Sequence, residues 1–235
     1  MNYDNKSVVI GIVMMMLLVV GVLVAGLSKV KSYNKPNTDA VVKVMVQTDY
    51  YTYSYSIPDG HSGWQGTGIF IDDNVILTAG HVVDYASSIR IITQSGEEYN
   101  AVSWYLEDNE LGDIGLIFVD TNEIEPRAMF DNAILGEDVW AFGNPFSVFP
   151  ILTKGIISSV NTPDTYLDGK NMLVADCPIN PGNSGCPLFD VDGNILGICS
   201  WCYNCSQGMT YFVRSEVIKL MLEKHKLLMK IVEVQ

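Results

Sequence analysis

Apolar residues recur in many short runs between residues 41 and 213, and polar, turn-forming residues separate the runs. The runs are rich in β-branched side chains, and clusters such as Asp72-Asp73-Asn74 and Asp192-Gly193-Asn194 mark the turns. Short strands bounded by such turns, without helices between them, are typical of antiparallel β-structure. The pattern therefore predicts an all-β region with strands at 41–46, 67–71, 75–78, 89–93, 101–106, 114–119, 138–142, 152–160, 172–176, 195–201 and 209–213.

The two ends of the chain follow other patterns. Residues 8–27 carry no charge, and a helix of that length would be about 30 Å long, which matches the hydrocarbon core of a bilayer. We predict a transmembrane anchor in residues 1–28; the alternative is a secretory signal peptide, whose apolar region is usually about 7–15 residues long. Residues 29–40 are polar and are predicted to form a linker. Residues 215–235 have apolar side chains at helical spacing, which predicts an amphipathic helix, with Ser215 as its N-cap, that packs on the β-region.

The composition narrows the classes of function. The 235-residue chain has a net charge of −13, whereas nucleic-acid binding depends on clustered Lys and Arg, so we expect no nucleic-acid partner. Residues 41–214 are numerous enough for one large all-β domain or for two small barrels that share a cleft. We call the predicted folded part after the linker, residues 41–235, the head. Lysines after the apolar span favour a cytoplasmic head, while five cysteines favour an oxidising compartment. We therefore predict a single-pass membrane protein and leave the side of its head open.

The candidate chemistry centres on a serine and a histidine. Ser184 lies between glycines in Gly182-Asn183-Ser184-Gly185, on a segment that must turn sharply, and His81 follows the predicted strand 75–78. A serine hydroxyl is a weak nucleophile that needs an adjacent base, usually histidine. The backbone N–H groups of Gly182 and Ser184 would then bind the developing oxyanion. The alternative is that this segment is an ordinary loop, since Asn, Gly and Ser are common in turns.

A third group must hold the other imidazole nitrogen of such a pair. Asp113 is the best candidate because it lies at the head of the apolar run 114–119, where a carboxylate can be partly buried. The other nearby acids are interpreted as solvated loop charges: Glu107, Asp108, Glu110 and Asp120. His61 in a loop and His225 on the terminal helix fit structural roles better than catalytic ones.

Five sequence blocks resemble the trypsin-fold serine proteases of the HtrA/Deg-like branch, and they occur in the same order along the chain as in that family. The blocks are 66–83, 112–119, 141–146, 152–160 and 179–198. The resemblance implies two six-stranded antiparallel β-barrels with the active site in their cleft, and a catalytic triad of His81, Asp113 and Ser184. Members of that branch are often tethered by an N-terminal membrane segment, and they need no cofactor.

The resemblance also implies where a substrate binds. Ile179 and Asn180 before the sharp turn, and Ser200, Trp201 and Cys202 on a strand beside the specificity pocket, are the expected contacts. Trypsin-like enzymes often have glycine where Cys202 stands, so its side chain should narrow the pocket and favour small or medium apolar residues. The family usually carries a peptide-binding PDZ domain after the protease, and we expect none here.

The cysteines leave several alternatives open. Cys199 and Cys202 are an odd number of positions apart on a predicted strand, so their side chains should point to opposite faces, and we expect no metal site. If the head is outside the cytoplasm, two disulfides among Cys177, Cys186, Cys199, Cys202 and Cys205 are expected. If it is cytoplasmic, buried free thiols are the natural interpretation.

Taken together, the sequence predicts a membrane-anchored serine endopeptidase that acts on unfolded or flexible protein segments. The alternative is a catalytically silent pseudoprotease that binds peptides or a partner on the same fold. The expected partners are a protein or peptide substrate and a lipid bilayer, and the sequence is compatible with a homo-oligomer without requiring one.

Overall fold

The structure is a computed structural model that describes residues 38–49, 62–107, 112–121, 129–148, 150–163, 171–202 and 208–233. The predicted membrane span, residues 8–27, and most of the predicted linker lie outside these residues. Within the described ranges, the helices are too short or too polar to cross a bilayer.

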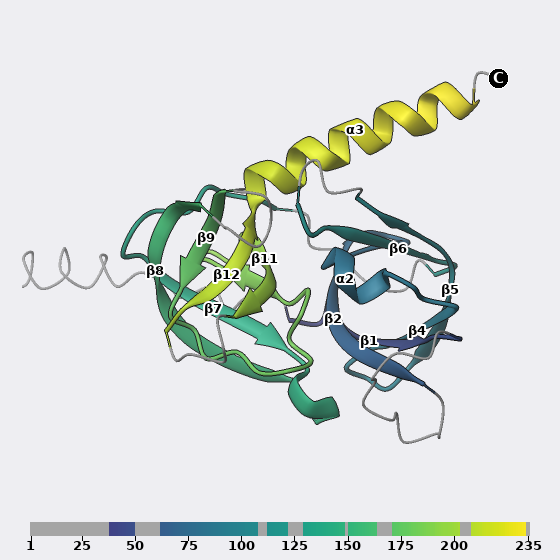
Figure 1. Cartoon of the computed structure of the whole chain (residues 1–235), viewed down its shortest axis with the longest axis horizontal. Coiled ribbons are helices and arrows are strands. Elements are labelled where there is room, and N and C mark those ends of the chain that lie inside the picture. Colours follow the sequence, from purple (N-terminus) through teal and green to yellow (C-terminus); the bar gives the residue numbers. More distant parts are fainter. Residues whose placement is uncertain are drawn as a thin grey trace, which may run out of the picture. The chain divides into compact units, whose positions relative to one another are not determined.

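Six antiparallel strands close into a first barrel in the order β1-β2-β3-β6-β5-β4 (Figure 1). Its strands are β1 (Val41–Gln47), β2 (Gly63–Asp72), β3 (Val75–Thr78), β4 (Ser88–Ile92), β5 (Glu98–Leu106) and β6 (Gly115–Val119). The turn-forming residues Asp73 and Asn74 connect β2 to β3, as their types predict. Branched side chains such as Ile69, Ile91 and Ile117 fill the interior.

A second closed barrel follows, in the order β10-β11-β12-β9-β8-β7 (Figure 1). Its strands are β7 (Asp138–Gly143), β8 (Ile151–Pro163), β9 (Asn171–Ala175), β10 (Pro187–Phe189), β11 (Ile195–Cys202) and β12 (Thr210–Arg214). A short 3-10 helix, η1 (Pro145–Ser147), lies between β7 and β8. The predicted pair of six-stranded antiparallel barrels is therefore confirmed.

The C-terminal helix α3 (Ser215–Glu233) begins directly after β12, which confirms the predicted helix. Ile218 and Met221 are fully buried while Leu220 is exposed, so one face of the helix packs on the barrels. The prediction that Ser215 is the N-cap is wrong in detail. The helix includes Ser215, which is buried, and its hydroxyl donates to the carbonyl oxygen of Asp131 at 2.6 Å.

Packing of the first barrel begins before β1. Thr38 and Ala40 are buried, and the carbonyl oxygen of Ala40 accepts a hydrogen bond from the N–H of Phe70 at 2.9 Å. The side-chain amide of Gln94 donates to the carbonyl oxygen of Thr38. These last residues of the predicted linker therefore belong to the folded head.

Candidate active site

His81 lies on the short helix α2 (Gly80–Val83), which starts two residues after β3 ends. Its backbone N–H donates to Asp113 Oδ1 at 2.7 Å, and its ring Nδ1 lies 2.7 Å from Asp113 Oδ2. We call these two bonds the two-point contact. Because one carboxylate binds both the backbone and the ring of His81, it fixes the orientation of the imidazole. The contact leaves Nε2 as the ring nitrogen that can act as a base.

Asp113 is nearly enclosed, with 9% of its side chain exposed. The hydroxyl of Ser200 donates to Asp113 Oδ2 at 2.6 Å, as a third hydrogen bond to the carboxylate. Burial by itself raises the pKa of Asp113, but hydrogen bonds from His81, the charge of His81 and the hydrogen bond from Ser200 outweigh burial and lower this pKa from its ordinary value. Asp113 is therefore a carboxylate at neutral pH.

The position of Ser200 follows from an irregularity in β11. The pairing of β11 with β12 shifts register between Cys199 and Trp201, so Ser200 is an extra residue in the ladder. Such a β-bulge redirects a side chain, and here the hydroxyl of Ser200 meets Asp113. The sequence analysis placed Ser200 among the substrate contacts and missed this bond. The available signal was a single hydroxyl residue at the end of the apolar run 195–199.

The loop that carries Ser184 comes from the second barrel but rests on the first. The carbonyl oxygen of Ser184 accepts a hydrogen bond from the N–H of Thr67 in β2 at 2.8 Å. Gly66, also in β2, lies between this loop and α2, because a Cβ on Gly66 would be 2.8 Å from the Val82 side chain and 3.1 Å from Ser184 O. The backbone of Ser184 is thus close to the helix that carries His81.

Gly185 fixes this arrangement through its backbone. Its φ is +83°, and a Cβ there would lie 2.2 Å from Thr67 O and 2.3 Å from Thr78 Oγ1. Only glycine combines that conformation with so close an approach. Among the described residues, Ser184 and His81 do not hydrogen-bond to each other, which is common for catalytic pairs before substrate binds.

The predicted oxyanion donors lie on a tight turn. The N–H of Asn183 donates to the carbonyl oxygen of Asn180 at 3.0 Å, and Gly182 has a φ of +101°. The carbonyl oxygen of Pro181 accepts a hydrogen bond from the N–H of Phe146 in η1 at 2.9 Å. Since N–H and C=O point in opposite directions across a trans peptide, the N–H of Gly182 is directed away from η1. In the described part of the chain, neither Gly182 nor Ser184 donates its N–H to another group.

The other predicted substrate contacts lie around the same end of the second barrel. Asn180 is exposed and Ile179 is half-buried. The ring of Trp201 stacks on that of Tyr211 with centroids 4.3 Å apart, and Cys202 is half-buried at the end of β11. Asn183, beside Ser184, is 4% exposed, and its Oδ1 has no hydrogen-bond partner among the described residues.

The buried cysteines Cys177, Cys186 and Cys199 are free thiols, Cys202 is half-buried, and Cys205 lies outside the described residues. Burial raises the pKa of Cys177 to about 12, and the hydrogen bond with Cys186, followed by burial, raises the pKa of Cys199 well above its ordinary value. Cys177 and Cys199 therefore stay protonated at neutral pH and are inert as nucleophiles.

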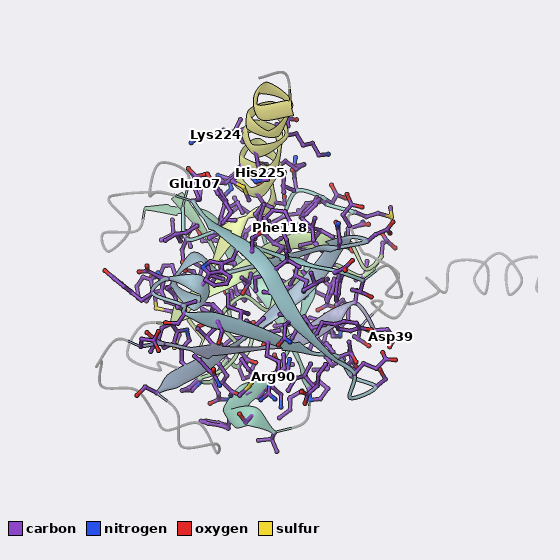
Figure 2. The ribbon with its side chains drawn as sticks, turned by 90° about the vertical axis from the view of Figure 1, so that its right-hand side faces the viewer. Asp39, Arg90, Glu107, Phe118, Lys224 and His225 are labelled. Atoms are coloured by element: carbon purple, nitrogen blue, oxygen red, sulfur yellow. The ribbon has the colours of Figure 1, made fainter. Side chains whose placement is uncertain are left out.

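One prediction about the nearby acids is wrong. Glu107 was interpreted as a solvated loop charge, but its side chain is 0% exposed. It accepts hydrogen bonds from the hydroxyl of Tyr105 at 2.8 Å and from Nζ of Lys224 in α3 at 3.1 Å (Figure 2). Asp120 is exposed, as predicted, whereas Asp108, Glu110 and His61 lie outside the described residues.

Comparison with known proteins gives one consistent result. A family model described as trypsin-like peptidase domain matches residues 66–198. The chain is 34% identical over 149 residues to a probable periplasmic serine endoprotease, DegP-like, of Halomonas elongata, covering 61% of this chain and 30% of the relative. It is 31% identical over 171 residues to human serine protease HTRA4, covering 69% of this chain and 35% of the relative. The chain thus spans about a third of the length of these curated relatives.

The fold comparison agrees with the sequence comparison. The structure is similar to the crystal structure of the serine endoprotease from Yersinia pestis, with a TM-score of 0.64 and 25% sequence identity. That similarity covers 80% of this chain and 62% of the other.

Proposed function

Because the chain belongs to the trypsin-like peptidase family and resembles its HtrA and DegP members, we propose that it is a serine endopeptidase with His81, Asp113 and Ser184 as its catalytic triad. The observation that carries this proposal is the two-point contact, in which both a backbone N–H and the ring Nδ1 of His81 lie 2.7 Å from the Asp113 carboxylate. An exposed histidine fixed in this way has one role that its chemistry favours, that of a general base.

The proposed reaction proceeds through an acyl-enzyme. Ser184 Oγ attacks the carbonyl carbon of the scissile peptide bond while Nε2 of His81 takes the hydroxyl proton. The N–H groups of Gly182 and Ser184 stabilise the resulting oxyanion. Collapse of the tetrahedral intermediate breaks the C–N bond, and His81 gives its proton to the leaving amine. Water then repeats the sequence on the ester, which releases the acid and restores Ser184.

Asp113 has two tasks in this proposal. It holds His81 in the tautomer with the proton on Nδ1, and as a carboxylate it stabilises the imidazolium formed in each half-reaction. The lowered pKa of Asp113 supports the second task, and the bond from Ser200 supports its orientation.

We propose that the substrates are unfolded or flexible protein segments. An extended segment would add as a strand beside Ser200–Cys202, where β11 continues past its pairing with β10 at Pro187 and Ile198. Ile179 and Asn180 would lie on the other side of the scissile bond. The side chain of Cys202 would restrict the pocket to small or medium apolar residues. Rapid cleavage after Arg by the purified protein would contradict this specificity.

We also propose that residues 8–27 anchor the protein in a membrane as a single-pass span. The absence of charge over these residues supports an anchor, and relatives named as periplasmic support export of the head. A protease-protection assay on intact cells and on opened membrane vesicles tests both points. Release of the head into the soluble fraction without detergent would contradict the anchor.

A fluorophosphonate probe tests the enzyme proposal directly, because it modifies only an activated serine hydroxyl. The wild type should be labelled, Ser184→Ala should not, and His81→Gln should be labelled much more slowly. A wild type that resists labelling while still binding an extended peptide would instead indicate the pseudoprotease.

A further inference from the structure

We infer that Lys224 of α3 and Glu107, which directly follows β5, are positioning residues. They hold the segment that contains Asp113 in the geometry that binds His81. The kinetic part of this inference rests on the proposed function. The contact between the two sites can also be measured without any peptidase activity, so the inference and the proposed function can fail separately.

The first step is the cluster formed by Glu107, Tyr105 and Lys224. Figure 2 shows Glu107 and Lys224 where α3 meets the first barrel. The Glu107 side chain is 0% exposed, whereas 39% of the Lys224 side chain is exposed. A buried carboxylate is costly unless it is paired and hydrogen-bonded. Tyr105 satisfies Oε2 from within β5, but the cation that satisfies Oε1 comes from the terminal helix.

His225, the next residue of α3, adds a ring contact to this cluster. Its imidazole stacks on Phe118 with centroids 5.7 Å apart and meets the Tyr105 ring edge-on at 5.1 Å. Partial burial lowers the pKa of His225, so the ring packs as neutral imidazole at neutral pH. Lys224 is therefore the cation that faces Glu107.

The second step leads from Glu107 to the catalytic carboxylate. Leu106 pairs with Gly115 at the end of the β5–β6 ladder, and the N–H of Glu107 donates to the carbonyl oxygen of Ile114 at 3.0 Å. Ile114 directly follows Asp113 in the chain. Glu107 therefore makes the last backbone hydrogen bond between the end of β5 and the segment just before β6. A shift of the Glu107 backbone would move Ile114, and with it the neighbouring Asp113 that binds His81.

The third step concerns how α3 is held. Its first turns are fixed by the fully buried Ile218 and Met221. Farther along, a cavity of about 380 Å³ lies between α3 and the first barrel, with Phe118, Leu222 and His225 in its wall. The Lys224–Glu107 ion pair and the His225 ring also contact the first barrel in this part of the helix. Removing Lys224 should therefore disturb Glu107 without undocking the first turns of α3.

The test compares Lys224→Met with Lys219→Met in the full-length protein. Lys219 lies on the same helix, where it donates to Asn132 Oδ1 at 3.5 Å and interacts with the charge of the half-buried Glu216, but it has no hydrogen bond to Glu107 among the described residues. Lys224→Met should lower kcat about tenfold with an unchanged KM, because the imidazolium loses support while the substrate strand is untouched. The acidic limb of the kcat–pH profile should move to lower pH. Lys219→Met should behave as wild type, and Lys224→Arg should restore the wild-type values.

An NMR measurement tests the inference independently of any peptidase activity. The proton on His81 Nδ1, donated to Asp113, should give a low-field NMR resonance that Asp113→Asn abolishes. This resonance should broaden or shift in Lys224→Met and stay unchanged in Lys219→Met.

Should Lys224→Met fail to fold, Tyr105→Phe can replace it. This variant removes the hydroxyl that donates to Glu107 and should shift the resonance to a smaller extent. An unchanged resonance in Lys224→Met, or in Tyr105→Phe when that variant replaces it, overturns the inference. Inactivity of the wild type with a shifted resonance overturns only the proposed function.

Discussion

The two barrels build their halves of the candidate site by different means. In the first barrel, His81 and Asp113 are joined by hydrogen bonds of 2.7 Å, and Ser200 on β11 of the second barrel donates a further one of 2.6 Å to Asp113. In the second barrel, the Ser184 loop depends on backbone conformations with positive φ, at Gly182 and Gly185. The neighbouring η1 adds Phe146 and Ser147, whose φ values are +54° and +58°.

The difference shows that one half is fixed by charge and the other by backbone shape. A buried carboxylate with three hydrogen bonds keeps the first half in place because each lost bond leaves a costly unpaired group. Non-glycine residues with positive φ cost about 1–3 kcal/mol each and persist only where the surroundings impose them. Removing charge should therefore damage the first half most, and adding a Cβ at its positive-φ glycines should damage the second.

The largest expected effect comes from Asp113→Asn, which keeps the size of the side chain and removes its charge. We expect kcat to fall about 10⁴-fold at neutral pH, because a neutral amide neither fixes the His81 tautomer nor stabilises the imidazolium. Steady-state kinetics on a flexible peptide measures this loss. A fall of less than about tenfold would show that Asp113 is not the third member of the triad.

The same variant gives a pH test of stability. The pKa of Asp113 is lowered in the folded protein, so its ionised form stabilises the fold above its unfolded-state pKa. That contribution disappears as the pH falls through the folded-state pKa. The difference in unfolding free energy between wild type and Asp113→Asn should shrink as the pH falls below about pH 4. Denaturant unfolding at each pH measures it.

The next effect tests the backbone of the second half. Gly185→Ala adds a Cβ that would lie 2.2 Å from Thr67 O, and we expect it to lower the unfolding free energy by about 3 kcal/mol or more. Gly96→Ala is the matched control, because Gly96 also has a positive φ, +92°, but nothing lies within 4 Å of its Cβ position. The control should cost about 1 kcal/mol. Equal costs would show that the contact between the loop and β2 is unimportant.

A smaller effect is expected from Ser200→Ala. Loss of one hydrogen bond to a charged group should lower kcat about tenfold and leave Asp113 bound to His81. Ser215→Ala also deletes a buried serine hydroxyl that donates to an oxygen at 2.6 Å, but far along the chain from the triad. That control should lose stability and keep its kcat, so equal kcat values for the two variants would contradict a role for Ser200.

The smallest effect concerns Ser147, whose φ is +58°. Ser147→Gly and Ser147→Ala both lose the hydroxyl that donates to Gln65, so their difference isolates the backbone. The glycine variant should be more stable by about 1 kcal/mol, because glycine adopts this conformation without strain. Thermal unfolding compares the two, and a more stable alanine variant would disprove the strain.

The sequence predicted the architecture because the strands carry their own signals. Branched residues between explicit turns identified most strands, and helical spacing identified α3. The start of β2 at Gly63 and the short β10 were missed, since glycine-rich segments such as Gly63–Gly66 lack alternation and β10 directly follows the Ser184 loop.

The site was only partly predictable. Motifs indicated His81 and Asp113, which the structure brings into contact, while catalysis by the triad stays a prediction. The Ser200–Asp113 bond depends on a one-residue register shift in β11, and burial of Glu107 depends on a helix more than a hundred residues later in the chain. Local sequence patterns contain neither kind of information.

Part of the apolar interior is shared between the barrels, although the second barrel also has a separate cluster that includes Leu173 and Phe212. One continuous cluster joins Ile69 and Ile117 of the first barrel to Phe189 and Val213 of the second, and extends to Ile218 of α3. Melting should consequently be a single cooperative event, in which Trp64 on one side and Trp140 on the other report the same midpoint. A change that loosens this shared cluster should then destabilise both barrels, including the first barrel with its His81–Asp113 contact.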